Sequence, residues 1–103
     1  MDQTIEDQIR EEVLKAREDV VSIVIFGSYA RGEQYEDLDV LVVMENLKPS
    51  LEDLKKATME LKSALKLGMG IDLLVYSRED CEANFRDHQP LFLDIAFDGA
   101  IVY

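Results

Sequence analysis

The stretch Phe26–Val43, FGSYARGEQYEDLDVLVV, decides the fold. A Gly-Ser pair, Gly27 and Ser28, follows one apolar run, and two acids, Asp37 and Asp39, begin the next. Both runs are rich in β-branched residues and apolar on both faces, which is typical of buried strands. The eight residues between the pair and the first acid are too few for a parallel crossover of about a dozen residues or more. We therefore expect two antiparallel strands joined by a turn or one short helical turn.

The rest of the chain alternates helical and strand patterns. Apolar residues recur at helical spacing from Thr4, where Asp7 completes a capping pattern, to about residue 19. Ser50 and Asp53 are expected to cap a second helix that ends at Gly68. Its expected core stripe consists of Leu51, Leu54, Ala57, Leu61 and Leu65. Strands are expected over 20–26, 38–44, 71–76 and 100–103, and a mainly helical segment over 77–96 with a break at Pro90.

The lengths of the connections predict the topology. Residues 45–70 are numerous enough for a helical crossover, so the second and third strands are expected to be parallel neighbours with a right-handed connection. That arrangement places Asp72 beside Asp37 and Asp39. The predicted fold class is therefore α/β (α+β), with a small mixed β-sheet and flanking helices in one domain over residues 1–103.

Composition excludes several classes of protein. The net charge of −11 argues against extended nucleic-acid binding, which needs a basic face, but allows a basic protein partner. The acids could equally serve solubility alone. The single cysteine, Cys81, forms no intrachain disulfide. The acidic N-terminus has no secretory signal and no apolar run approaches the length of a membrane span, so a soluble, cytoplasmic protein is expected.

The two acids of the second strand indicate a metal site. Side chains two residues apart on a strand point to the same face, so Asp37 and Asp39 can converge on one cation, with Asp72 adding a third carboxylate. Carboxylates buried without partners would cost several kcal/mol each. Arg31 and Lys48 are the basic residues expected nearby. A divalent cation is the simplest compensation, and oxygen ligands favour Mg²⁺ or Mn²⁺.

The Gly-Ser pair indicates a phosphate site next to these acids. Gly27 ends a strand and allows a phosphate to approach the backbone, and Ser28 can cap the following turn, whose N–H groups can bind an anion. A phosphate cradle beside a carboxylate metal site is typical of metal-assisted phosphoryl or nucleotidyl transfer.

Gly27-Ser28, the strand motif Asp37-Leu38-Asp39 and Asp72 together resemble the DNA polymerase β-like nucleotidyltransferase superfamily. The local sequences GSYARGE and DLDVLVV are most similar to the minimal nucleotidyltransferases, which are often paired with a helical HEPN protein in toxin–antitoxin systems. The resemblance covers essentially the whole chain. The spacer between the Gly-Ser pair and the first acid is shorter than is usual in this group, which leaves the position of the phosphate cradle open.

The resemblance implies a role for each motif residue. Asp37 and Asp39 would hold two Mg²⁺ ions, and Asp72 would complete the site of the ion that activates the nucleophile. Gly27 and Ser28 would hold the triphosphate of ATP, with Arg31 assisting. The family implies transfer of AMP to a tyrosine hydroxyl of the HEPN-type partner, which is thereby silenced.

Simpler interpretations exist for each residue. Asp37 and Asp39 could belong to a turn before a strand, and Asp72 could be an ordinary residue at a strand start. Arg31 could be a surface partner of Glu33 or Glu36. His88, the one histidine, is expected to be a surface residue.

Two functions from different classes follow. The first is an enzyme, an Mg²⁺-dependent nucleotidyltransferase acting on a partner hydroxyl. The second is a catalytically weak or inactive subunit that neutralises a basic partner by binding it. Transfer to a small molecule such as an aminoglycoside is a weaker third alternative, since the chain has no additional acceptor domain.

Overall fold

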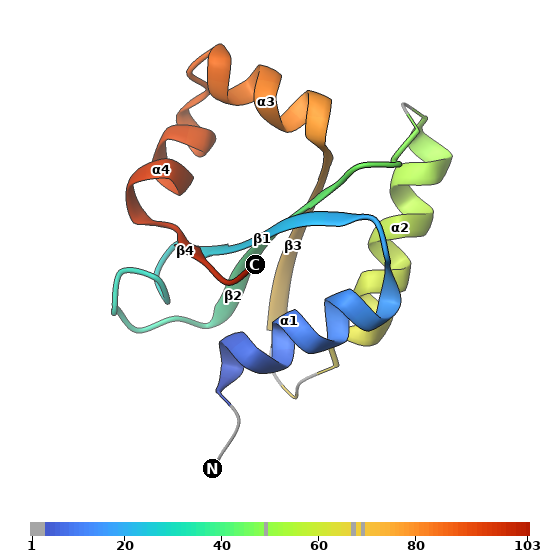
Figure 1. The fold of residues 1–103 in the computed structure, drawn as a ribbon. Helices are drawn as coiled ribbons and strands as arrows, with labels where there is room; N and C mark the ends of the chain where they lie inside the picture. The colour runs from blue at the N-terminus through green and yellow to red at the C-terminus, as the bar shows by residue number, and fades with distance from the viewer. Residues whose placement is uncertain (1–3, 49, 67, 69) are drawn as a thin grey trace.

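The computed structural model describes residues 4–48, 50–66, 68 and 70–103. Its helices and strands, in chain order, are α1 Ile5–Ala16, β1 Val20–Phe26, β2 Asp37–Met44, α2 Leu51–Ala64, β3 Gly70–Ser77, α3 Arg78–Arg86, α4 Pro90–Asp98 and β4 Ala100–Ile101. The strands form one sheet in the order β3-β2-β1-β4. Helices α1 and α2 cover one face of this sheet, and α3 and α4 pack against the other (Figure 1).

The pairing of the strands confirms the predicted mixed sheet. β1 and β2 are antiparallel, and Phe26 lies opposite Asp39. β2 and β3 are parallel, and Asp39 lies opposite Asp72. The short strand β4 adds to the outer edge of β1 in an antiparallel sense. The central strand β2 therefore has a neighbour on each side, and its first residues lie between the end of β1 and the start of β3.

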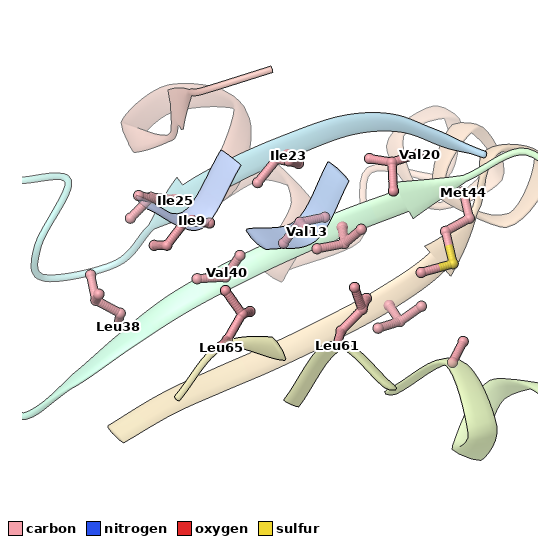
Figure 2. Close-up of a cluster of buried hydrophobic side chains, with 13 residues drawn as sticks. Ile9, Val13, Val20, Ile23, Ile25, Leu38, Val40, Met44, Leu61 and Leu65 are labelled. Carbon is pink, nitrogen blue, oxygen red and sulfur yellow. The ribbon is translucent and has the colours of Figure 1, made fainter. Parts of the chain in front are cut away.

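Alternation along β2 divides the core into two layers. Leu38, Val40 and the other even-numbered residues of β2 belong to the cluster shared with α1 and α2, where Ile9, Val13, Leu61 and Leu65 lie beside β1 and β2 (Figure 2). Leu41 and Val43 belong instead to the cluster with α3 and α4. Because side chains on a strand alternate between faces, Asp37 and Asp39 lie on the α3–α4 face of the sheet.

Local capping explains where the helices begin. The hydroxyl oxygens of Thr4 and Ser50 each accept a hydrogen bond of 3.1 Å from the N–H of the residue three positions on, as predicted. Ser77 caps α3 in the same way. Pro90 is the first residue of α4, where its missing N–H is tolerated. The predicted break in the C-terminal helical segment therefore lies just before Pro90, where His88 has a positive φ of 55°.

The structure corrects several element predictions. Leu51 is 67% exposed, because it lies in the first turn of α2, and is not a core residue. Helix α1 ends at Ala16, since Arg17 is already extended at φ −141°. Helix α2 ends at Ala64, before the predicted Gly68. The terminal strand contains two residues, Ala100 and Ile101, rather than four, although Val102 and Tyr103 still form backbone hydrogen bonds with Ile23 of β1. The predicted domain includes residues 1–3, which lie outside the described residues.

No helix within the described ranges combines the length and the apolar character that spanning a membrane requires.

Candidate functional site

Three aspartates predicted to act together lie on one face at one end of the sheet. We call Asp37, Asp39 and Asp72 the carboxylate site. Asp39 and Asp72 are opposite residues of parallel strands, which lie about 4.8 Å apart. Asp37 is two residues before Asp39 on the same strand, about 7 Å away along it. Asp37 and Asp72 are exposed, whereas Asp39 is partly buried, so the site opens to solvent.

Negative charge is in excess at the carboxylate site. Burial raises the pKa of Asp39 above its ordinary value, and the neighbouring carboxylates of Asp72 and Asp37 raise it further. Arg31 opposes this shift. The site therefore brings three acids together with one nearby guanidinium, an arrangement that favours an added cation.

The chemistry of the donor atoms fits a hard divalent cation such as Mg²⁺. In their present arrangement, however, no group of three or more His, Cys, Asp or Glu side chains among the described residues could hold a metal ion. The positions of the side chains explain this. The carboxylate of Asp39 lies against Gly27 of the β1 end, while that of Asp37 lies against Gly70 on the opposite side. Asp37 would therefore have to rotate toward the other two for all three to share ions.

Glycine is required at position 27 for two reasons, its backbone conformation and the limited space beside it. Its φ of +77° is in the left-handed region that glycine adopts readily. A Cβ at this position would also overlap the carboxylate of Asp39 and lie 3.1 Å from its Cγ. Sequence reasoning predicted that Gly27 admits a phosphate. The structure adds a second reason, since Gly27 makes room for Asp39.

The segment that follows is a closed turn over residues 27–33, which we call the Gly27 turn. The N–H of Arg31 donates to the Gly27 carbonyl at 3.2 Å, and the N–H of Glu33 donates to the Ser28 carbonyl at 2.9 Å. Within the described part of the chain, the N–H groups of residues 28–30 donate to no protein acceptor. These groups are suited to an anion such as a phosphate.

Tyr29 attaches the Gly27 turn to the first helix. Its hydroxyl donates to Glu6 of α1 at 2.9 Å, and its ring contacts Tyr35 edge to face at 5.1 Å. Burial raises the pKa of Tyr29, and the Glu6 carboxylate raises it further. Sequence reasoning missed this anchor, because the partners are far apart along the chain.

Arg31 lies at the rim of the site. Its Nε donates to Glu33 at 3.1 Å and its Nη2 donates to the Ser28 hydroxyl at 3.4 Å. Its Nη1 is 3.9 Å from the Asp98 carboxylate at the end of α4. The predicted surface pair with Glu33 is therefore present, and the proximity of Arg31 to Asp39 is present as well.

The suggestion that Lys48 lies near the acids is wrong. Lys48 follows Met44, the last residue of β2, whereas Asp37 is the first residue of that strand. A strand of eight residues separates the two by about 25 Å. Asp98, which sequence reasoning did not consider, contacts Arg31 instead, and no local pattern could have shown this because α4 reaches the turn only through the tertiary fold.

Comparison with known protein families gives one match over nearly the whole chain. The family model described as "Nucleotidyltransferase domain" matches residues 6–103. A protein of Methanocaldococcus jannaschii, "Putative protein adenylyltransferase MJ1305", is 30% identical over 110 residues. That alignment covers 100% of this chain and 75% of MJ1305.

Solved structures show the same fold. One is a chain of the "toxin-antitoxin with AMP-PNP", with a TM-score of 0.64 and 19% identity, covering 97% of this chain and 73% of that one. Another is a chain of a complex described as "tri-AMPylated Shewanella oneidensis HEPN toxin in complex with MNT antitoxin". It has a TM-score of 0.57 and 18% identity, covering 95% of this chain and 68% of that one. At these identities the likeness concerns the fold alone.

Proposed function

Because this chain belongs to the nucleotidyltransferase domain family, as its motif residues predicted, we propose that it transfers AMP from ATP to a hydroxyl group of a protein. The acceptor we propose is a tyrosine of a HEPN-type helical partner, which is silenced by the modification. The observation that carries the proposal is the register of β2 and β3, which places Asp72 opposite Asp39, with Asp37 on the same face.

The relatives support the reaction and the partner. MJ1305 has the name of a protein adenylyltransferase, qualified as putative, and aligns with the whole of this chain. Of the chains with the same fold, one belongs to a toxin–antitoxin crystallised with AMP-PNP, and another to a complex that contains an AMPylated HEPN toxin. An ATP donor and a HEPN partner are therefore the assignments that these relatives favour.

The residues of the site have separate tasks in this proposal. With Asp37 rotated toward the other two, Asp37, Asp39 and Asp72 would hold Mg²⁺, which when bound activates the attacking oxygen and stabilises the leaving pyrophosphate. The free N–H groups of the Gly27 turn and the side chains of Ser28 and Arg31 would orient the triphosphate. The acceptor oxygen forms a bond to the α-phosphorus, the bond from that phosphorus to the β-phosphate breaks, pyrophosphate leaves, and the hydroxyl proton passes to water.

The exposure of the site suits a protein acceptor. Asp37 and Asp72 face solvent, so a side chain presented by a second protein can approach the carboxylate site. The net charge of −11 would attract a basic partner. The same charge also supports the alternative function, a subunit that neutralises its partner by binding alone.

A transfer assay tests the proposal. Wild type, Asp39→Asn and Glu52→Gln are each incubated with Mg²⁺, a HEPN-type partner and ATP labelled on the α-phosphate. Glu52 is exposed on α2, across the sheet, so Glu52→Gln controls for the loss of one charge. We expect label on the partner with wild type and with Glu52→Gln. With Asp39→Asn we expect the rate of labelling to fall at least 100-fold, which corresponds to a loss of about 2.7 kcal/mol or more in transition-state stabilisation.

The same assay separates the two functions. A partner that is neutralised without ATP, and equally well by a variant that carries both Asp37→Asn and Asp39→Asn, would support the binding subunit. Label that persists at the wild-type rate with Asp39→Asn would refute the assignment of Asp39.

A further inference from the structure

Helix α4 is apolar on two faces. Phe92 and Ile95 are buried in the cluster that α4 shares with β1 and β2. On the solvent side of the helix, Leu93 is exposed, and Phe97, one turn further along, is 85% exposed. A surface helix normally carries polar residues on the side away from the core, and a helix that is apolar all round is normally covered. The outer face of α4 is therefore an apolar surface left open to solvent.

Strand β4 extends this apolar surface. Ile101 lies opposite Val24 in the antiparallel pair of β4 and β1, so both side chains point to the same face of the sheet. Val24 belongs to the cluster with α4, and Ile101, which is 78% exposed, therefore lies on the α4 side at the outer edge of the sheet. We call Leu93, Phe97 and Ile101 the outer α4 patch.

The charges of α4 also set it apart from the other helices. Helices α1, α2 and α3 each have a basic residue in the last turn, where a cation is favourable, and α4 has none. It carries Asp94 and Asp98 four residues apart, a spacing at which like charges repel. Asp98 has Arg31 nearby, whereas Asp94 forms no ion pair within the part of the chain that the structure describes. A cationic side chain from another molecule would relieve this repulsion.

The outer α4 patch lies close to the carboxylate site. Asp98 directly follows Phe97, and its carboxylate is 3.9 Å from Nη1 of Arg31 at the rim of the site. Figure 1 shows α4 and β4 beside the turn that joins β1 to β2. A protein that presents a hydroxyl group to the site can therefore contact the patch at the same time.

We propose that the outer α4 patch docks the acceptor protein, through an apolar surface of that protein flanked by Lys or Arg. The inference rests on the proposed function, which supplies the acceptor. Apolar side chains exposed together, with charges at their rim, are typical of an interaction surface. A second copy of this chain fits the patch less well, because it would bring Asp94 and Asp98 of both copies together in chains of net charge −11.

The test measures binding of the HEPN-type partner by isothermal titration calorimetry without ATP. The chains compared are wild type, Phe97→Gln, Ile101→Thr and the control Met59→Gln, whose methionine is 68% exposed on α2, across the sheet. We expect each change in the patch to weaken binding at least 10-fold, as the loss of an apolar anchor does, and Met59→Gln to bind as wild type does. Urea unfolding checks the fold. Because the two patch residues belong to different elements, one variant decides the question if the other fails to fold.

A second comparison tests the charge of the partner. Asp94→Asn should weaken binding at low salt and lose this difference at high salt, because charges at the rim of an interface act through screened attraction. Glu52→Gln, which removes an exposed charge from α2, should have no effect at either salt concentration. Equal binding by Asp94→Asn and wild type at low salt would overturn the assignment of a basic partner.

Two other results would overturn the docking surface. One is binding of the partner by Phe97→Gln and Ile101→Thr as tight as by wild type, or a wild type that does not bind the partner. The other is a wild type that sedimentation equilibrium shows to be a dimer and that Phe97→Gln makes monomeric, since the patch would then belong to a second copy.

The outcome for the proposed function is separate. A partner that binds through the patch but takes up no label from ATP overturns the transfer and leaves the docking surface standing. A partner that is labelled with the same KM by wild type and by both patch variants leaves the transfer standing and overturns the docking surface.

Discussion

Replacing Asp39 with asparagine should stabilise the protein without a divalent cation and destabilise it relative to wild type with one. Asp39 is partly buried and lies across from Asp72, with Asp37 on the same face. Two unit charges about 5 Å apart repel by about 3 kcal/mol at an effective dielectric constant of 20, and by about 1 kcal/mol in water. Because Asp72 is exposed, we expect the lower figure, so Asp39→Asn gains about 1 kcal/mol in the free energy of unfolding.

The free energy of unfolding should also depend on pH, because the same burial and neighbouring carboxylates shift the pKa of Asp39. The pKa of Asp39 is raised in the folded protein, so the unfolded chain releases this proton more readily. Without a cation, the contribution of Asp39 therefore favours folding below the pKa of the unfolded chain and is lost as pH rises through the folded value. The difference in stability between Asp39→Asn and wild type should grow over that interval and level off at neutral pH.

Adding Mg²⁺ should reverse the order of stability. A cation that binds only the folded protein at ten times its dissociation constant stabilises it by about 1.4 kcal/mol. Wild type should gain this amount, while Asp39→Asn gains little. The assay is urea unfolding of both chains and of Glu52→Gln, at pH 7, in EDTA and in Mg²⁺. A wild type more stable than Asp39→Asn in EDTA, or an equal Mg²⁺ effect on both, would refute the reasoning.

Three further predictions concern the Gly27 turn. Gly27→Ala should lose about 1–2 kcal/mol of stability through its positive φ, and should lose Mn²⁺ binding through its overlap with Asp39, both measurable on one preparation. Tyr29→Phe removes the hydrogen bond to Glu6 and should lower the free energy of unfolding by about 1 kcal/mol, with no further loss when Glu6→Gln is added. Arg31→Ala should raise the KM for ATP about 10- to 150-fold with a smaller change in kcat, since one charged contact to phosphate is worth about 1.5–3 kcal/mol. An unchanged KM would limit Arg31 to its surface pair with Glu33.

The sheet and the carboxylate site were predictable because they depend on short-range patterns. Two β-branched runs with too short a spacer must be antiparallel, and a long connection with a helical stripe permits a parallel neighbour. Once that topology holds, strand alternation places Asp37 and Asp39 on one face and register brings Asp72 beside them. These steps need only the period of a strand and the length of a loop.

The contacts around the site could not be predicted in this way. The carboxylate of Asp37 lies against Gly70 of the neighbouring strand, and Asp98 reaches Arg31 from a helix formed near the end of the chain. Both relations depend on how three-dimensional packing orients particular side chains. The prediction for Lys48 was wrong because it used closeness in sequence. Lys48 follows the last residue of β2, whereas the acids lie at the start of that strand.

The short spacer bears on the choice between an enzyme and a binding subunit. The hydrogen bonds that close the Gly27 turn involve residues up to Glu33, so the turn is complete before the chain crosses to β2. Residues 34–36 then form an exposed link, in which Tyr35 packs against Tyr29 of the turn. The short connection between β1 and β2 is therefore accommodated in this link, outside the turn that would hold phosphate. Gly27 still lies against Asp39. The spacer is thus no argument against catalysis, and the choice depends on whether transfer requires Asp39.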